Sequence, residues 1–309
     1  MKQGVLPMSH TVKILTLALT ALFLLPLGAG SVPLADPYIL LDNGTYYAYG
    51  THSDTGIEVY TSNDLKTWKY SGLALKKGDA WGSKWFWAPE VYKTGQGYLM
   101  YYSAEEHICA AEAKSPLGPF TRQEKTPMLP EWKAIDHTLV IINGRPRIYF
   151  SRIRNGLSIW TAELEDDLVT IKRKTLKLCI APSQKWEKKL GAVNEGAAVL
   201  QHNGKFHLTY SANDYQSQDY GIGCAVSNRA TGPWKKYADN PLLQKPGKLV
   251  GVGHHCFFYD KNKVLRVVFH AHLNQKNIHP RQMHITTAGF KNGKLEISPD
   301  YFTPQLQKE

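Results

Sequence analysis

The sequence contains little cysteine, four in 309 residues, and no two cysteines are spaced as Cys-x-x-Cys. A zinc site is therefore not indicated. Cysteine this sparse in apolar segments is more often a small buried side chain, so we predict that no disulfide is required. The chain also lacks a continuous basic helix and any nucleic-acid-binding motif, and we expect no nucleic-acid partner.

Acidic residues are outnumbered, since the formal net charge is +11. The excess of lysine and arginine is scattered in short clusters such as 172–174, 188–189 and 235–236. Such clusters are typical of solvated strand edges, where lysine also blocks edge-to-edge pairing. The alternative interpretation is that the positive charge attracts an acidic polysaccharide.

The sequence has one long apolar run, from Ile14 to Pro26. Lys2 and Lys13 precede this run and small residues follow it at 28–31, which is typical of a secretory signal peptide. An uncleaved anchor helix is the alternative, although the run is short for a membrane span. We predict a signal peptide over 1–30, a secreted or periplasmic protein and no membrane association of the mature form. Without a Pro/Ser-rich linker, residues 31–309 are expected to form a single domain.

Five segments of the remaining chain follow one plan, in which an ionisable residue leads an apolar strand, a turn and a second strand with aromatic residues. Further strands follow each hairpin and end in an aromatic such as Trp68, Phe120 or Trp234. The leading residues recur at intervals of roughly 50 positions, which is typical of β-propeller blades. The sequence therefore predicts an all-β fold, a five-bladed β-propeller. The five leading residues are Asp36, Glu90, Asp136, Glu195 and His254.

The innermost strand of each propeller blade runs along the central channel, so equivalent residues should meet at one end of it. Four carboxylates and a histidine would then share a small funnel, where burial and repulsion separate their pKa values. That arrangement suits acid and base catalysis of glycosidic hydrolysis. Glu90 is expected either to bind sugar hydroxyls or to pair with a cation or arginine in the channel.

A separate cluster of aromatic residues at 81–87 precedes one channel strand. Aromatic rings stack on the apolar faces of sugars, so Trp85 and Trp87 are predicted to line the pocket. Trp68, Phe120 and Trp234, by contrast, are expected to pack blade against blade.

Several short motifs, in this order, resemble glycoside hydrolase family 43. They are Ala35-Asp36-Pro37, Trp87-Ala88-Pro89-Glu90, Ile135-Asp136-His137, Asn194-Glu195-Gly196, Gly251-Val252-Gly253-His254 and Arg281-Gln282-Met283-His284-Ile285. The resemblance covers essentially the whole mature chain. It implies a five-bladed propeller that acts by inversion on arabinose- or xylose-containing plant glycans.

The resemblance also implies roles for individual residues. Asp36 matches the catalytic base, Asp136 the carboxylate that tunes and orients the acid, and Glu195 the general acid. Arg281 matches an arginine that holds the acid or the substrate, and His254 matches a central histidine that lies beside a metal, often calcium, in some members.

The chain departs from the family pattern where proline is frequent. His137 follows the modulating aspartate and Ala197 follows the Glu-Gly pair. A second histidine, His255, follows His254, and we include it among the substrate-binding candidates. These departures concern the choice of substrate more than the three carboxylates.

The predicted function is removal of terminal pentose, foremost α-L-arabinofuranosyl, from an oligo- or polysaccharide by an inverting acid/base mechanism. A β-xylosidase, a galactan-directed hydrolase and a non-catalytic glycan-binding propeller are the alternatives. No cofactor is expected to be required, a structural calcium ion in the channel is possible on the family pattern, and we expect a monomer.

Two other enzyme classes share part of the pattern. The stretch 62–68 resembles the Asp-box of sialidases but lacks its usual glycine, and the repeats number five rather than six. Sucrose and fructan hydrolases would require Trp-Met-Asn-Asp-Pro and Arg-Asp-Pro motifs, and the chain has neither.

Overall fold

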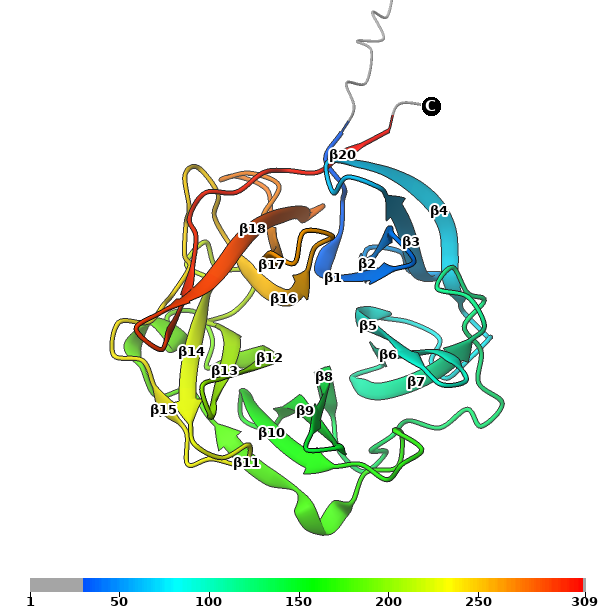
Figure 1. Ribbon diagram of the computed structural model, residues 1–309, viewed down its shortest axis with the longest axis horizontal. Coiled ribbons are helices and arrows are strands. Elements are labelled where there is room, and N and C mark those ends of the chain that lie inside the picture. Colours follow the sequence, from blue (N-terminus) through cyan, green and yellow to red (C-terminus); the bar gives the residue numbers. More distant parts are fainter. Residues whose placement is uncertain (1–29, 308–309) are drawn as a thin grey trace, which may run out of the picture.

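The computed structural model describes residues 30–307, which form five β-sheets arranged around a central axis (Figure 1). Each sheet is one blade, and its strands follow one another outward in chain order. The five innermost strands are β1 (Ala35–Asp42), β5 (Trp87–Thr94), β8 (Ala134–Ile142), β12 (Asn194–His202) and β16 (Gly253–Tyr259). The predicted five-bladed β-propeller is therefore confirmed. The predicted signal peptide lies outside the described residues, except for Gly30.

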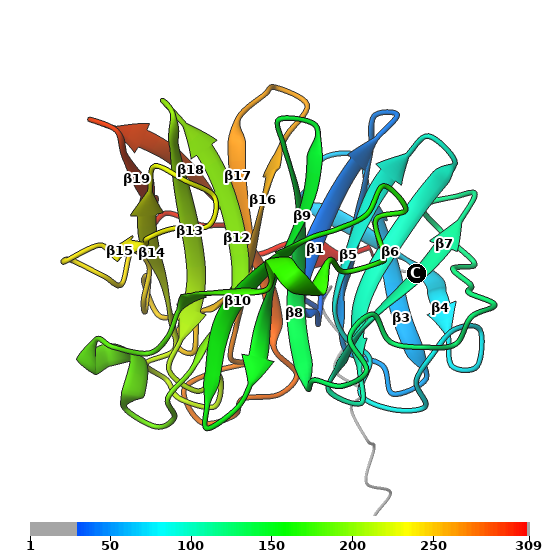
Figure 2. The same ribbon diagram turned by 90° about the horizontal axis from the view of Figure 1, so that it is seen from below.

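Each innermost strand pairs with a second strand, and these are β2 (Thr45–Thr51), β6 (Gly97–Ala104), β9 (Arg145–Ile153), β13 (Lys205–Ala212) and β17 (Leu265–Ala271). The third strands are β3 (Gly56–Ser62), β7 (His107–Ala113), β10 (Leu157–Glu163), β14 (Gly221–Ser227) and β18 (Gln282–Lys291). The outer strands are β4 (Thr67–Lys76), β11 (Lys177–Ile180), β15 (Lys235–Lys236) and β19 (Lys294–Ile297), and short 3-10 turns are η1 (Arg173–Thr175) and η2 (Lys185–Lys188). Figure 2 shows the strands from the side, running between the two faces of the ring.

The core consists of five apolar clusters, each between two neighbouring blades. Successive side chains of a strand point to opposite faces, so adjacent aromatics can serve two clusters at once. Tyr101 of β6 packs against blade 3, whereas Tyr102 packs against blade 1. Trp68 and Phe120 are fully buried in these layers, as expected of blade packing.

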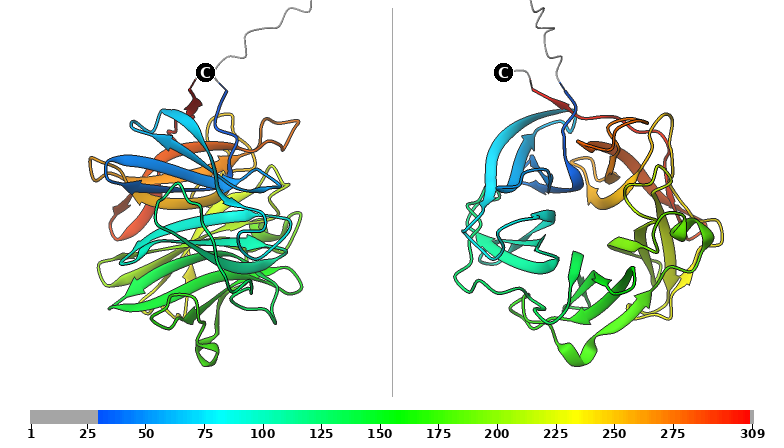
Figure 3. Two further views of the ribbon diagram at one scale, coloured as in Figure 1. Left: turned by 90° about the vertical axis from the view of Figure 1, so that its right-hand side faces the viewer. Right: turned by 180° about the vertical axis from the view of Figure 1, so that it is seen from behind.

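Two blades differ from the plan of four strands. Blade 2 has three strands, because the chain after β7 crosses to blade 1, where the backbone N–H of Phe120 donates to the carbonyl of Ala74 (2.7 Å). Blade 1 has a fifth strand, β20 (Gln305–Leu306), which pairs in parallel with β4. Both ends of the described chain therefore lie at blade 1, as the views from the side and from behind show (Figure 3). Leu306 donates its backbone N–H to the carbonyl of Gly30 (2.7 Å), which closes the ring.

The four cysteines are free thiols, three of them buried. Within residues 30–307, no helix has the length and apolar character needed to cross a membrane.

Candidate active site

Every innermost strand has a β-bulge close to its first residue. One residue of each bulge adopts a left-handed conformation, with φ between 43° and 56°. Bulges commonly redirect side chains beside active sites. The five residues are Asp36, Ala88, Asp136, Gly196 and His254. Ala88 has the same conformation although its side chain is not ionisable, so the bulge is a feature of the blade fold itself. In three of the five blades, the bulge residue carries an ionisable side chain.

The bulges correct one expectation from the repeats. The five leading residues were expected to be equivalent, but only Asp36, Asp136 and His254 occupy the bulge position. Glu195 precedes its bulge residue by one position, and Glu90 follows its bulge residue by two. A shift of one or two positions is invisible in a repeat about 50 residues long. Glu90 therefore belongs to the next layer of the channel.

The bulge amides bond to the second strand of the preceding blade. Hydroxyl groups of Thr51, Ser103 and Ser211 accept the backbone N–H of Ala88, Asp136 and His254, at 2.9, 3.2 and 2.7 Å. In blade 5 the equivalent residue is His270, whose Nδ1 accepts the backbone N–H of Asp36 at 3.0 Å. These bonds join neighbouring blades at four of the five junctions and orient the bulge residues there.

Asp36 lies among three basic side chains. Arg281 donates from Nη1 to Oδ1 at 3.0 Å and from Nη2 to Oδ2 at 3.4 Å. Nδ1 of His254 lies 3.3 Å and Nδ1 of His270 lies 3.2 Å from Oδ1. Burial by itself would raise the pKa of Asp36, but Arg281, assisted by the two histidines, outweighs burial and holds the pKa well below its usual value. Asp36 is therefore ionised at neutral pH.

His270 lies beside both the carboxylate and the arginine. Its Nε2 lies 3.3 Å from Nη1 of Arg281, and its side chain is fully buried. Because Nδ1 accepts the backbone N–H of Asp36, a neutral ring carries its proton on Nε2, so this contact with Arg281 is packing and not a hydrogen bond. Burial, together with the charge of Arg281, lowers the pKa of His270 to about 3. The imidazole is therefore neutral and adds no charge between Asp36 and Arg281.

Glu195 and Asp136 form a pair with raised pKa values. Burial is the largest cause for both, and the neighbouring charge of Asp36 adds to it. The pKa of Glu195 rises to about 7, although a hydrogen bond from Tyr220 opposes the rise, and the pKa of Asp136 lies well above its usual value. The pair titrates as a unit, because each carboxylate makes ionisation of the other less favourable. The structure thus brings together one ionised carboxylate and a carboxyl pair that retains a proton.

The two predicted tryptophans lie in the loop that leads into β5. Trp85 is 42% exposed, and its ring stacks on Trp87 with 5.6 Å between centroids and 12° between planes. Nζ of Lys84 lies 4.2 Å from the centroid of Trp85. Because Trp87 directly precedes the bulge residue Ala88, the pair lies at the same end of the ring as the carboxylates.

Glu90 and His255 lie elsewhere. Glu90 faces the channel interior, accepts a hydrogen bond from the hydroxyl of Tyr92, and has a pKa raised to about 8 by burial. His255 is buried between blades 4 and 5, where its Nε2 lies 2.7 Å from the Thr209 hydroxyl. The structure therefore does not bring His255 into the cluster around Asp36, and substrate contacts by these two residues stay predictions.

The comparison of sequences decides the family. The pattern described as "Glycosyl hydrolases family 43" matches residues 26–295. The chain belongs to this family. It is thus a glycoside hydrolase, in agreement with an ionised carboxylate and a proton-retaining carboxyl pair that converge at one end of the propeller channel.

Solved structures resemble this family 43 hydrolase closely. A structure described as an endo-1,4-beta-xylanase from Bacteroides thetaiotaomicron is 42% identical, with a TM-score of 0.87, over 90% of this chain and 98% of that one. A thermostable family-43 glycoside hydrolase is 34% identical, with a TM-score of 0.82, over 90% and 96%. Among curated proteins, an extracellular exo-alpha-(1->5)-L-arabinofuranosidase from Cellvibrio japonicus is 25% identical, over 75% of this chain and 77% of its own.

The family pattern allows a calcium ion beside His254, and calcium prefers six to eight oxygen ligands. Among residues 30–307, no group of three or more His, Cys, Asp or Glu side chains could hold a metal ion. Asp36, the carboxylate closest to His254, is occupied by Arg281. The residues of the family 43 channel therefore do not fit a directly coordinated calcium ion, and the mechanism below uses none.

Sequence reasoning missed three residues at the site, namely His270, Asp214 and Tyr220. Asp214 lies close enough to Glu195 to add to the rise of its pKa. Only His270 carried a detectable signal, because it ends the second strand at the place where other repeats have serine or threonine. Tyr220 and Asp214 lie in the 213–220 loop, which follows no repeat pattern.

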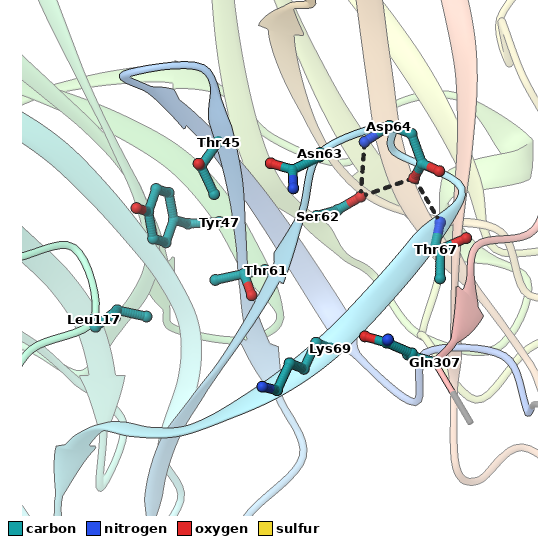
Figure 4. A pocket seen from close by; sticks show the side chains of 10 residues that line it. All are labelled: Thr45, Tyr47, Thr61, Ser62, Asn63, Asp64, Thr67, Lys69, Leu117 and Gln307. Atoms are coloured by element: carbon teal, nitrogen blue, oxygen red, sulfur yellow. Dashed lines mark hydrogen bonds between the residues drawn. The ribbon is translucent and has the colours of Figure 1, made fainter. Parts of the chain in front are cut away.

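A hollow of about 400 Å³ on blade 1, whose lining side chains are drawn in Figure 4, includes none of the residues of this site. Its carboxylate, Asp64, accepts the backbone N–H groups of Lys66 and Thr67, both at 2.8 Å, and a hydrogen bond from the Ser62 hydroxyl. The Asp-box-like stretch 62–68 is therefore a turn that holds Trp68 in the core, and Asp64 stabilises this turn.

Proposed function

We propose that this family 43 hydrolase removes terminal α-L-arabinofuranosyl groups from a plant-type polysaccharide with inversion of configuration. The observation that supports this most is the opposite state of two buried carboxyl groups at one end of the channel. Arg281 keeps Asp36 ionised, whereas burial raises the pKa of Glu195 to about 7. An inverting hydrolase needs one group of each kind on opposite sides of the sugar.

In this mechanism, Asp36 accepts a proton from a water molecule as the water oxygen attacks the anomeric carbon. Glu195 donates its proton to the glycosidic oxygen as the bond between that oxygen and the anomeric carbon breaks. Arg281 holds the Asp36 carboxylate in place, His270 holds the Asp36 backbone N–H, and Asp136 helps keep a proton on the acid pair. A non-catalytic glycan-binding propeller would not need such opposed protonation states.

The choice of arabinose rests on relatives of the Cellvibrio type, and endo action is an open alternative, because one relative from Bacillus subtilis is described as an endo-alpha-(1->5)-L-arabinanase. The second candidate is a xylose-directed enzyme, which is favoured by the 42% identity to the structure described as a xylanase. A galactan-directed hydrolase is the third. The stacked pair of exposed Trp85 and half-buried Trp87 suits each of these substrates, since sugars present apolar ring faces.

We also propose that the protein is secreted and acts as a monomer. The N-terminal sequence has the pattern of a signal peptide, and several curated relatives are described as extracellular.

The test is release of nitrophenol from a panel of aryl glycosides, comprising α-L-arabinofuranoside, β-xyloside, β-galactoside and β-galactofuranoside. The Glu195→Gln variant is assayed alongside, and the anomer first formed is identified by NMR. We expect turnover of the arabinofuranoside, loss of turnover in the variant and an inverted product.

Turnover of another glycoside would move the assignment to that sugar. Absence of turnover on the panel would lead to assays on arabinan, xylan and arabinogalactan, and inactivity on all of these would refute the proposed activity. A retained configuration would refute the inverting mechanism.

A further inference from the structure

Tyr220 directly precedes β14 in blade 4, and its side chain is fully buried. Its hydroxyl donates a hydrogen bond of 2.7 Å to Oε1 of Glu195. Burial and the nearby charge of Glu195 raise the pKa of Tyr220 well above its usual value, so the hydroxyl remains a donor throughout the working pH range. The side chain predicted to act as the acid is therefore held by a residue outside the repeat pattern.

The ring of Tyr220 packs against two neighbouring residues of blade 5. It stacks on His270, with 5.8 Å between ring centroids and 11° between ring planes. It also lies against Gly253, the cross-strand partner of His270, where an added Cβ would come within 2.2 Å of Cε1 of Tyr220. A residue with a side chain at position 253 would displace the ring, so the backbone of β16 forms a close-fitting wall.

His270 also contacts Asp36 and Arg281, so Tyr220 links the two halves of the site. We propose that Tyr220 is a positioning residue that orients Glu195 for proton donation. Through its stack on His270, it also fixes the position of the Glu195 carboxyl group relative to that of Asp36. This inference rests on the role of Glu195 in the proposed function.

The hydrogen bond has a chemical consequence. Because Tyr220 donates to Oε1, the acidic proton of Glu195 is directed to Oε2, which is the oxygen that must face the leaving group. When Oε2 gives up this proton, the negative charge that develops on the carboxyl group strengthens the bond from Tyr220. The contact is therefore stronger in the transition state than in the ground state, and such contacts accelerate catalysis.

The charged and titratable groups that face Glu195 come from four elements besides its own strand. They are Asp36 of β1, Asp136 of β8, Asp214 and Tyr220 of the loop between β13 and β14, and Arg281 before β18. Among them, Tyr220 and Arg281 lower the pKa of Glu195. Removal of the Tyr220 hydroxyl should therefore raise this pKa, and activity that requires protonated Glu195 should persist to higher pH.

The experiment compares Tyr220→Phe with Tyr210→Phe in the full-length protein. Tyr210 is a matched control, because it lies in the same blade, is fully buried and donates at 2.7 Å to another carboxylate, Glu187. Activity is measured against pH on methyl, nitrophenyl and dinitrophenyl derivatives of the preferred sugar. Independently of any substrate, the pKa of Glu195 is measured by carboxyl carbon NMR, with Glu195→Gln used for assignment.

For Tyr220→Phe we expect kcat to fall about 10- to 100-fold on the methyl glycoside and much less on the dinitrophenyl glycoside, which needs little acid assistance. We expect the midpoint of the alkaline limb of the pH–activity profile, and the pKa of Glu195 measured by NMR, to rise by about 0.5 to 1 pH unit. Tyr210→Phe should change neither the alkaline limb nor the pKa of Glu195, whatever its effect on Tm.

An unchanged Glu195 pKa in Tyr220→Phe would overturn the proposal. Equal loss on all leaving groups without a shifted limb would do the same, since it would indicate a purely structural role. Full activity of Glu195→Gln would instead refute the proposed acid itself, so the two failures are distinguishable.

Discussion

His270 accepts the backbone N–H of Asp36 in blade 5, at the position where serine or threonine accepts the corresponding amide in three other blades. The histidine makes this contact between blades part of the site, because its imidazole ring also packs beside Arg281 and stacks on Tyr220. A serine at this position would keep the hydrogen bond to the Asp36 amide but lose the packing against Arg281 and Tyr220.

We therefore expect His270→Ser to fold stably and to reduce kcat/KM about tenfold or more, since Arg281 and Tyr220 both lose a neighbour. His270→Val is the matched control, because it leaves the buried amide of Asp36 without an acceptor. That variant should lose a further 1 to 3 kcal/mol, roughly, of stability relative to serine. Thermal unfolding measures the stability of both variants, and steady-state kinetics measures their activity. Equal stability of the two variants would contradict a stabilising role for the hydrogen bond between the Asp36 backbone N–H and residue 270.

The pH profile of kcat/KM should be bell-shaped and displaced to the acid side. Activity requires ionised Asp36, whose pKa lies well below its usual value, so the acid limb should appear only well below pH 4. Activity also requires a proton on Glu195, so it should fall as pH rises through about 7. A profile that is flat from pH 6 to 9 would contradict this assignment.

Replacement of the two carboxyl groups proposed as base and acid should affect stability differently. Asp36→Asn leaves the largely buried guanidinium of Arg281 without its counter-charge, and breaking such a pair costs about 3 kcal/mol. Glu195→Gln removes a carboxyl group whose ionisation is already disfavoured by burial and should leave stability nearly unchanged. Both should lose most activity. Urea unfolding measures the difference, and equal destabilisation would show that the Arg281 pair is not the cause.

The Trp85–Trp87 stack should matter for longer substrates. Trp85→Ala removes an exposed ring, so we expect KM for a polysaccharide or oligosaccharide to rise about tenfold. The kcat for an aryl monosaccharide should change little. Tyr259→Ala serves as control, because Tyr259 is another exposed aromatic but ends β16, at the opposite end of the innermost strand from the site. A loss of kcat on all substrates would instead place Trp85 at the reacting sugar.

The C-terminal strand β20 should stabilise the ring without contributing to catalysis. Truncation after Pro304 removes backbone hydrogen bonds from Gln305 to Lys66, Leu306 to Gly30 and Gln307 to Trp68. At about 1 kcal/mol each, the loss should be about 3 kcal/mol, visible as a lower Tm with an unchanged pH profile. An unaltered Tm would show that closure depends on the contacts between blades 1 and 5 alone.

Local pattern was enough to predict the blades, because each repeat carries its own alternating strands and turn residues. The count of five followed from the recurrence of this pattern, and the placement of Asp36 and Asp136 at the channel followed from it as well. Glu195 was also found, but its supposed equivalence with Asp36 was wrong, because the bulge that shifts the register leaves no mark in an apolar strand.

The sequence by itself determined the architecture and the family, since period-2 strands and ordered motifs are properties of neighbouring residues. Only the tertiary structure decided which groups share the site. Tyr220 reaches Glu195 across 25 positions through the folding of blade 4, and Arg281 reaches Asp36 across 245 positions through closure of the ring between blades 5 and 1. The protonation states were decided in the same way, because burial and neighbouring charge exist only once the five blades have packed.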